Sequence, residues 1–184
     1  LREYGYGQVE THLNEWNLSH DRRLNQGTSF ASANVTAMMI GMQRKKTDML
    51  MYYDARPGTG MNGIFKANEP LKSYYDYIIF RDLLHLGTYV PTPYMDDKIY
   101  TCAATDGESY AMMLTYFDPD DHAEARTLSL EFKKPEGAYK VEYYLVDDEH
   151  DHELIREEYF TSDTFKVYLN VGNYSVYDIK ITKM

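Results

Sequence analysis

The chain has 184 residues, of which 43% are hydrophobic and 26% charged, a composition typical of folded globular proteins rather than disordered or fibrous ones. Its formal net charge of −10 argues against a nucleic-acid partner, because binding to that backbone needs clustered Lys and Arg. No apolar stretch reaches the roughly 18 to 20 residues of a membrane span, so no membrane partner is expected either. Cys102 is the only cysteine, which excludes a disulfide framework, and its apolar surroundings indicate a buried side chain.

The first half of the chain has the pattern of two β/α units. Strands are expected over residues 9–14 and 47–53, and helices over residues 28–44 and from Pro70 to just before Gly87. The stretch "TSFASANVTAMMIGMQR" carries small and apolar residues at three-to-four spacing, which favours a helix packed closely on a sheet. Strand, helix, strand, helix implies parallel strands joined by crossover helices.

From about residue 98 the pattern changes to short alternating runs separated by turns. The runs are "IYTCAAT", "YAMMLTYF", "RTLSLEF", "YKVEYYLV", "TFKVYLN" and "YSVYDIKI", with turns such as "DG" and "KPEG" between them. This spacing predicts an antiparallel β-sandwich of about six to eight strands. We place the boundary in the stretch that holds Pro91 and Pro93, giving a domain over residues 1–95 and a second over residues 96–184.

The order of motifs in the first half resembles a known family. "NEWN" at a strand end, an Ala-rich helix, "MYYDARPG", "NGIF" and "PLKSYYDYIIFRDLLHLG" are similar to the C-terminal part of clan A glycoside hydrolases, and most similar to glycoside hydrolase family 39, the β-xylosidase and α-L-iduronidase family. The resemblance covers residues 1–95. It implies that these residues form about two units of an eight-fold β/α (TIM) barrel, with the sandwich following it.

The resemblance also assigns roles to residues near the two strand ends. Glu15 matches the catalytic nucleophile of a retaining glycosidase, a place consistent with barrel sites at the carboxyl ends of strands. A carbohydrate is then the expected substrate, with no cofactor. The residues expected to line the sugar site are Trp16, Asn17, Tyr52, Tyr53 and Asp54, together with the weaker candidates Arg56, Asn62 and Phe65 in the following loop. For Trp16 a place in the protein core remains an alternative.

A second Asn-Glu pair, Asn68-Glu69, is followed by Pro70 and invites comparison with Glu15. In clan A the acid/base Glu also follows an Asn, but it precedes the nucleophile in sequence. Asn68-Glu69 comes after Glu15, where an acidic residue and Pro70 fit the start of a helix. We therefore expect a structural role for this pair.

A complete barrel takes roughly 250 residues, so 95 residues supply about two of eight units. We expect the chain to be a C-terminal fragment of a retaining glycoside hydrolase for xylosides, arabinosides or related glycosides, inactive alone because the acid/base is missing. Its exposed strand edges are expected to pair with the missing barrel half or with another copy. The chain begins with Leu1 and is expected to start inside a larger protein, so its compartment stays open.

Two acidic runs contain residue types that bind metal ions. "DDEHDHE" at 147–153 and "DPDDH" at 118–122 carry possible ligands, but both patterns are more typical of solvated turns, so no metal is expected. A different class of function remains as an alternative, namely a non-catalytic module whose sandwich binds carbohydrate or serves as a structural appendage.

Overall fold

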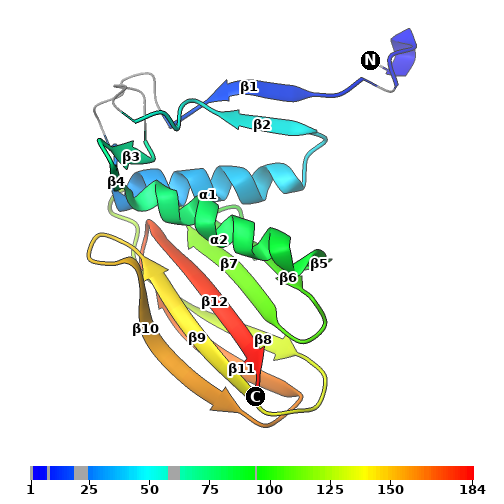
Figure 1. The fold of residues 1–184 in the computed structure, drawn as a ribbon, viewed down its shortest axis with the longest axis vertical. Coiled ribbons are helices and arrows are strands. Elements are labelled where there is room, and N and C mark those ends of the chain that lie inside the picture. The colour runs from blue at the N-terminus through cyan, green and yellow to red at the C-terminus, as the bar shows by residue number, and fades with distance from the viewer. Residues whose placement is uncertain (1, 8, 19–24, 58–62, 94) are drawn as a thin grey trace.

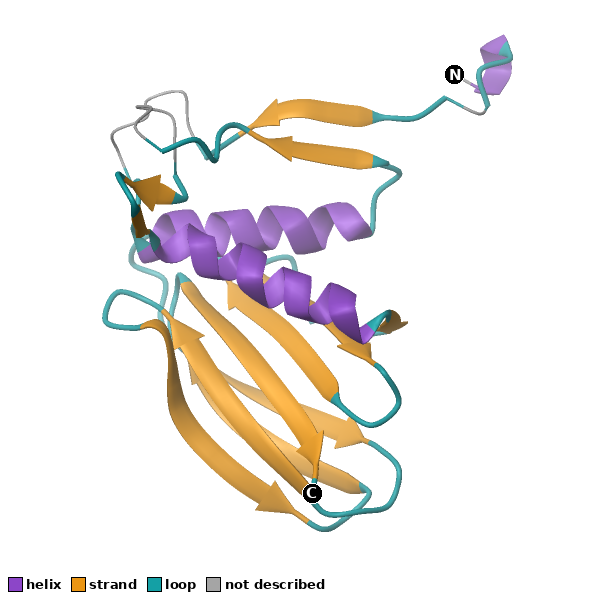
Figure 2. Cartoon of the chain, viewed as in Figure 1, coloured by secondary structure: helices purple, strands orange, loops and turns teal. Residues whose placement is uncertain are grey.

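The computed structural model describes residues 2–7, 9–18, 25–57, 63–93 and 95–184. Its layers follow one another along the long axis: a two-stranded ribbon, a pair of helices, and two β-sheets (Figures 1 and 2). In chain order the elements are a 3₁₀ turn Arg2–Tyr4, β1 His12–Trp16, α1 Ser29–Gln43, β2 Met49–Tyr52, β3 Phe65–Lys66, β4 Glu69–Pro70, α2 Lys72–Leu86, β5 Thr88–Val90, β6 Ile99–Thr105, β7 Tyr110–Tyr116, β8 Arg126–Lys133, β9 Tyr139–Val146, β10 Asp151–Phe160, β11 Thr164–Val171 and β12 Ser175–Lys183.

The ribbon consists of β1 and β2, which pair in parallel as the β/α pattern predicts. Parallel strands cannot be joined by a tight turn, and α1 supplies the crossover. The register is irregular: three residue steps on β1, from Leu13 to Trp16, correspond to two steps on β2, from Leu50 to Tyr52. β1 therefore carries a bulge at Asn14 and Glu15.

Helix α1 agrees with its predicted bounds. Thr28 is its N-cap, and the Thr28 hydroxyl accepts a hydrogen bond from the backbone N–H of Ala31 at 3.3 Å. Gly87 ends α2 in a left-handed conformation with φ 82°, which a residue without a Cβ adopts at low cost. The predicted start of α2 at Pro70 is wrong: Pro70 pairs with Phe65 in the small β3–β4 hairpin, and the helix begins two residues later at Lys72.

The second half contains two antiparallel sheets. One has the strand order β10-β9-β12-β7-β6-β5, and the other pairs β11 with β8. Residues of both sheets share one core, so the sheets pack face to face as in a β-sandwich. The core members buried most fully are Leu114, Tyr116, Tyr139, Val141, Tyr143, Val167, Val171 and Ile179.

Two strands of the large sheet lie outside the runs that the sequence pattern identified. β10 is an edge strand of ten residues in which charged side chains are frequent, so it shows no clear alternation of apolar and polar residues. β5 has only three residues and pairs with β6 at the opposite edge, although it precedes Pro91 and Pro93. The division of the chain after residue 95 stays a prediction; β5 precedes it in the sequence but pairs with the large sheet.

The two helices cover the outer face of the large sheet. A second core joins Trp16 of β1 to helix residues such as Ile40 and Ile79 and to sheet residues such as Met113 and Val176. The helices are therefore buried between the ribbon and the sheet (Figure 1). This explains why apolar and small residues surround α1 on nearly all sides, in contrast to the single apolar stripe of a surface helix.

The turn between β9 and β10 ties the sheet to the helix starts. Asp148 accepts a hydrogen bond from the Ser29 hydroxyl of α1 at 2.6 Å, and Asp151 receives the ammonium group of Lys72 of α2 at 2.8 Å. His152 follows, with its Nε2 3.0 Å from the buried carboxylate of Asp178. The run "DDEHDHE" thus begins in a hairpin turn, as expected, but its acids contact both helices and its last residues belong to β10. In the described part of the chain, no helix is long and apolar enough to cross a membrane.

Candidate active site

The candidate site lies where the ribbon strands end. The carboxyl ends of β1 and β2 point the same way and lie side by side (Figure 1). Beyond the last paired residues, the backbone N–H of Tyr53 donates to the Trp16 carbonyl at 2.9 Å. The residues that follow both strands are thereby brought close together, an arrangement that parallel sheets commonly use for binding and catalysis.

Glu15 is exposed, next to the buried Trp16. In a regular strand, Glu15 would lie on the same face as Leu13, which packs against the helix core. The bulge changes this, because it puts Leu13 and Trp16 on the helix face and turns Glu15 outward. Met51 and Tyr53 alternate with the helix-facing residues of β2, so they also lie on the open face. The Glu15 carboxylate is therefore accessible to a ligand on that face.

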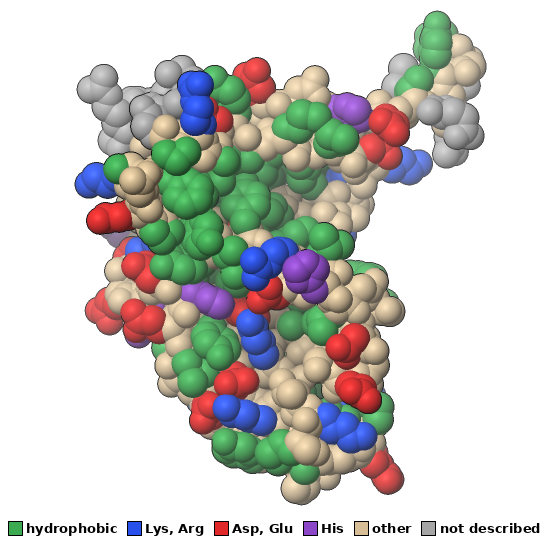
Figure 3. Space-filling model, in the orientation of Figure 1, with side chains coloured by type: hydrophobic (Ala, Val, Ile, Leu, Met, Phe, Trp, Pro, Cys, Tyr) green, Lys and Arg blue, Asp and Glu red, His purple; other side chains and the backbone are tan. Residues whose placement is uncertain are grey.

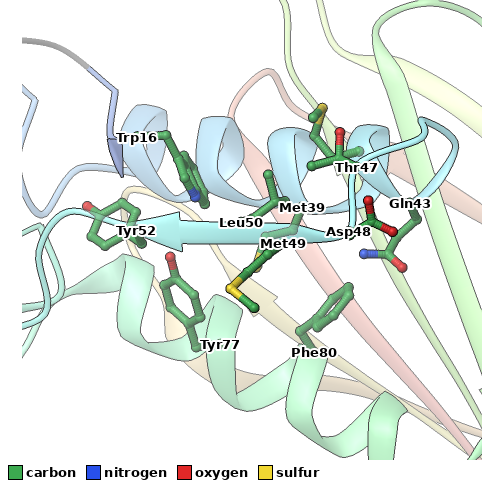
Figure 4. A pocket seen from close by; sticks show the side chains of 11 residues that line it. Trp16, Met39, Gln43, Thr47, Asp48, Met49, Leu50, Tyr52, Tyr77 and Phe80 are labelled. Carbon is green, nitrogen blue, oxygen red and sulfur yellow. The ribbon is translucent and has the colours of Figure 1, made fainter. Parts of the chain in front are cut away.

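Trp16 lies on the opposite face from Glu15 and is only 7% exposed. Its ring packs edge-on against Tyr52, with centroids 5.1 Å apart, and lines a groove of about 330 Å³ between β2 and the helices, which has both apolar and polar walls. Figure 4 shows Tyr77 and Phe80 of α2 rising toward β2 across this groove. Among the described residues, Glu15, Asn17 and Tyr53 do not line it. The structure thus places Trp16 in the core, and its assignment to a sugar site stays a prediction.

Asn17 joins the two strand ends through its side-chain amide. Its Nδ2 donates to the Tyr53 carbonyl at 2.6 Å, and its Oδ1 accepts from the Leu18 backbone N–H at 2.6 Å and from the Tyr52 hydroxyl at 3.2 Å. The sequence predicts that Asn17 binds substrate. In this structure its amide contacts the protein backbone and the partly buried Tyr52.

Tyr52 and Gly63 complete this arrangement. A Cβ on Gly63 would lie 2.2 Å from the Tyr52 hydroxyl, so the close approach requires glycine at this position. Burial raises the pKa of Tyr52 to about 12, against the lowering effect of its hydrogen bond with Asn17, so the hydroxyl stays a donor at neutral pH. The resemblance includes Gly63 in "NGIF", but the sequence alone gave no reason to connect it with Tyr52.

The remaining predicted residues follow β2. Tyr53 is 39% exposed, Asp54 is half-buried, and Arg56 is exposed. Asn62 lies outside the described residues. Phe65 begins the β3–β4 hairpin and packs against Tyr74 of α2, with ring centroids 5.3 Å apart. The structure therefore brings Glu15, Asn17 and Tyr53 together at one end of the ribbon, where β1 and β2 both end. Trp16 and Phe65 instead pack toward the helices.

The second Asn-Glu pair lies in the hairpin. Asn68 is in the turn between β3 and β4, and Glu69 is exposed in β4, paired with Lys66. Cys102 is buried, as expected, and burial raises the pKa of its thiol. Within the described residues, no group of three or more His, Cys, Asp or Glu side chains is placed to hold a metal ion.

The surface around the ribbon is rich in apolar side chains. Figure 3 shows hydrophobic atoms gathered over the ribbon and the helices, in contrast to the mixed charges over the sheets. Contiguous apolar surface on a protein marks a region that contacts another surface or a ligand. On the face shown in Figure 3, the region of the ribbon and the helices has that character.

Comparisons with known proteins identify the fold. No family model matches the sequence, and no curated protein matches it. Among solved structures, a glucosidase from Croceicoccus marinus has a TM-score of 0.85 at 16% identity, covering 100% of this chain and 48% of that one. The GH39 enzyme from Xanthomonas axonopodis pv. citri has a TM-score of 0.75 at 10% identity, with 96% and 45% covered.

A GH30 endoxylanase from Clostridium papyrosolvens has a TM-score of 0.67 at 15% identity, with 100% and 44% covered. The chain thus spans about half the length of the solved structures it matches. Its structural neighbours are glycoside hydrolases, and family 39 is among them at low sequence identity.

Proposed function

We propose that this chain is the C-terminal part of a retaining glycoside hydrolase and that it supplies the catalytic nucleophile, Glu15. One observation carries the proposal: Glu15 is exposed at the carboxyl end of a parallel strand, in a chain whose whole length matches glycoside hydrolases. Because the neighbours extend well beyond the matched part, the activity is proposed for the longer protein that contains this chain. In that protein β1 and β2 are the last two strands of a TIM barrel.

The proposed chemistry follows from the two carboxyl groups of a retaining glycosidase. The Glu15 carboxylate attacks the anomeric carbon and forms a glycosyl ester, while a second carboxylic acid protonates the departing oxygen. Water then hydrolyses the ester with that second group acting as base. The two carboxyl groups must lie about 5 to 5.5 Å apart. The second one is proposed to lie in the preceding part of the barrel, so residues 1–184 alone are expected to be inactive.

The substrates proposed are xylosides, arabinosides or related glycosides. Tyr53, with its ring partly exposed on the same face as Glu15, has the strongest support as a sugar contact. Asp54, Arg56 and Asn62 follow in the loop after β2 and are proposed as further contacts. Trp16 has the weakest support, because its ring lies on the helix side of the ribbon.

The ribbon edges are proposed to pair with the rest of the barrel. Among the described strands, β1 and β2 pair only with each other. Each therefore has one edge available for a neighbouring strand, and exposed edges of parallel strands favour further pairing. The groove beside β2 would be covered in the same assembly.

The test uses the longer protein with aryl glycosides of xylose, arabinose and glucose in both anomeric forms. A 2-deoxy-2-fluoro glycoside of the preferred sugar should trap a covalent ester, and mass spectrometry of the digest should place the label on Glu15. Glu15→Gln should lower kcat/KM roughly a thousand-fold or more. Glu69→Gln is the matched control, because Glu69 also follows an Asn and is exposed; it should retain activity.

Three outcomes would contradict the proposal. A label on a different carboxylate would remove Glu15 from its role. Absence of hydrolysis by the longer protein with every glycoside would favour the non-catalytic module. Hydrolysis by residues 1–184 alone, abolished by Glu15→Gln, would contradict the expectation that the acid/base lies elsewhere.

A further inference from the structure

The end of β1 has few regular contacts at the point where Glu15 lies. The bulge interrupts the register with β2 between Leu13 and Trp16, so Asn14 and Glu15 lie where the ladder is irregular. After the bulge, the backbone N–H of Tyr53 donates to the Trp16 carbonyl at 2.9 Å and joins the two strand ends. Side-chain hydrogen bonds between the strand ends add to this backbone bond in fixing the segment that carries Glu15.

The side chain of Asn17 supplies such bonds. Its Nδ2 binds the Tyr53 carbonyl at 2.6 Å, so Tyr53 is held to β1 through its N–H and through its carbonyl. Its Oδ1 accepts from the Leu18 N–H at 2.6 Å, which fixes the amide plane relative to its own backbone. The two strand ends are thereby joined on both sides of the Tyr53 residue.

Tyr52 supports the same amide from the protein interior. Its hydroxyl donates to Asn17 Oδ1 at 3.2 Å, and its ring is packed between Trp16 and Tyr77 with centroid distances of 5.1 and 5.7 Å. Gly63 approaches the hydroxyl so closely that no Cβ fits between them. Because the Tyr52 ring points to the helix side, it is separated from a ligand on the Glu15 face, and its influence there must pass through Asn17.

We propose that Asn17 is a positioning residue, which acts with Tyr52 to set the direction of the Glu15 carboxylate relative to the exposed ring of Tyr53. This inference rests on the proposed function, and it changes the expected role of Asn17 from substrate binding to orientation of the nucleophile. Misplacement of a reacting group by about 1 Å can cost about a hundredfold in rate. Loss of these bonds should therefore affect catalysis more than substrate affinity.

The experiment compares Asn17→Ala, Tyr52→Phe and the double variant in the longer protein. Asn17→Ala should lower kcat and the rate of Glu15 labelling by about ten- to a hundredfold, with KM changed by less than about threefold. Tyr52→Phe should lower both rates by about threefold to tenfold. The double variant should match Asn17→Ala, because Tyr52 acts through Asn17. Asn17→Asp replaces the donor to the Tyr53 carbonyl with a second acceptor, so it should not restore the loss of Asn17→Ala.

Tyr77→Phe is the matched control. Tyr77 is a neighbouring, partly buried tyrosine on α2 whose hydroxyl has no hydrogen-bond partner among the described residues. The Tyr77→Phe variant should therefore behave like the unmodified protein. Hydrogen exchange gives a readout independent of activity. Peptides that cover the ends of β1 and β2 should exchange faster in Asn17→Ala and Tyr52→Phe, but not in Tyr77→Phe.

The outcomes separate this inference from the proposed function. If the unmodified protein is not labelled at Glu15, the proposed function fails and the positioning role fails with it. If Glu15 is labelled but Tyr52→Phe equals Tyr77→Phe in rate and exchange, the positioning role alone is overturned. An Asn17→Ala variant with raised KM and unchanged kcat would likewise overturn it and return Asn17 to substrate binding.

Discussion

The ribbon and the large sheet are both built from strands, but they are covered very differently. In the ribbon, residues that face away from the helices are open, with Met51 40% and Tyr53 39% exposed. In the large sheet, Val141 and Ile179 are fully buried, because the helices cover one face of the sheet and the β8–β11 pair covers the other. The candidate chemistry thus lies in the least covered part, whereas the packing that stabilises the fold lies in the sheets and helices.

The largest difference in stability is expected between two methionine variants, one in the large sheet and one in the ribbon. Met113 of β7 is fully buried against the helices, and Met113→Ala should lower the free energy of unfolding by about 2 to 5 kcal/mol. Met51→Ala removes the same kind of side chain from the open face of β2 and should change the free energy of unfolding by about 0.5 kcal/mol or less. Denaturant unfolding of both variants measures the difference. Equal losses would show that the ribbon is as well packed as the sheet.

Much of this contrast was readable from the sequence. The bounds of α1, β6 and β9 follow from apolar periodicity and cap residues, because buried strands and helices must satisfy those patterns. β10 was missed because an edge strand need not alternate, and its many charges gave the pattern of a loop. The resemblance predicts that the helices belong to a barrel, where one face of each helix packs on the strands. A sequence pattern cannot reveal that another face of the helices packs on the large sheet.

At the site, position along the strand was predictable and direction was not. The motif placed Glu15 at the end of β1, and the structure agrees. The bulge that turns Glu15 outward and Trp16 inward depends on pairing with β2, which is not local information. The same holds for the bond between Asn17 and Tyr53, which joins residues 36 positions apart.

Helix α2, which lies between the two regions, contains the buried carboxyl group of Asp76. We expect this group to make the free energy of unfolding depend on pH, with a smaller effect than that of Met113→Ala. Burial raises the pKa of Asp76 well above its usual value, although the hydrogen bond from the Ser32 hydroxyl acts in the other direction. The stability that Asp76 contributes is therefore fully present below its unfolded value of about 3.9 and is lost as pH rises through the raised folded value. Asp76→Asn keeps the acceptor for the Ser32 hydroxyl but cannot ionise.

Asp76→Asn should therefore raise the free energy of unfolding at pH 8 relative to the unmodified protein, with a smaller difference at pH 5. Asp82, on the same helix, provides the control. Burial acts to raise its pKa, but hydrogen bonds and charges of Arg81 and Lys180 outweigh this and lower it. Asp82→Asn should remove stability that is present above the unfolded value and lost as pH falls. The same pH trend in both variants would contradict the assignment of Asp76.

A smaller effect is expected where the sheet is tied to the helix starts. Lys72 is 14% exposed and binds Asp151 and the His150 carbonyl at 2.8 and 3.1 Å. Lys72→Met should lower the free energy of unfolding by about 1 kcal/mol, because one partner remains in solvent. The control Lys133→Met removes an exposed lysine 3.6 Å from Glu131 and should have no measurable effect. A loss for Lys72→Met no larger than for Lys133→Met would show that the β9–β10 turn does not fasten the helices.

The smallest effect on stability is expected from Glu15→Gln. Glu15 is exposed in a bulge, so its side chain stays in contact with water, and the change should alter the free energy of unfolding by less than about 0.5 kcal/mol. The same change is expected to abolish trapping of a glycosyl ester in the longer protein. If labelling is lost while stability is unchanged, the chemistry and the stability of the protein lie in different regions. A large stability loss would instead mean that Glu15 supports the fold, and the contrast between ribbon and sheet would lose its functional meaning.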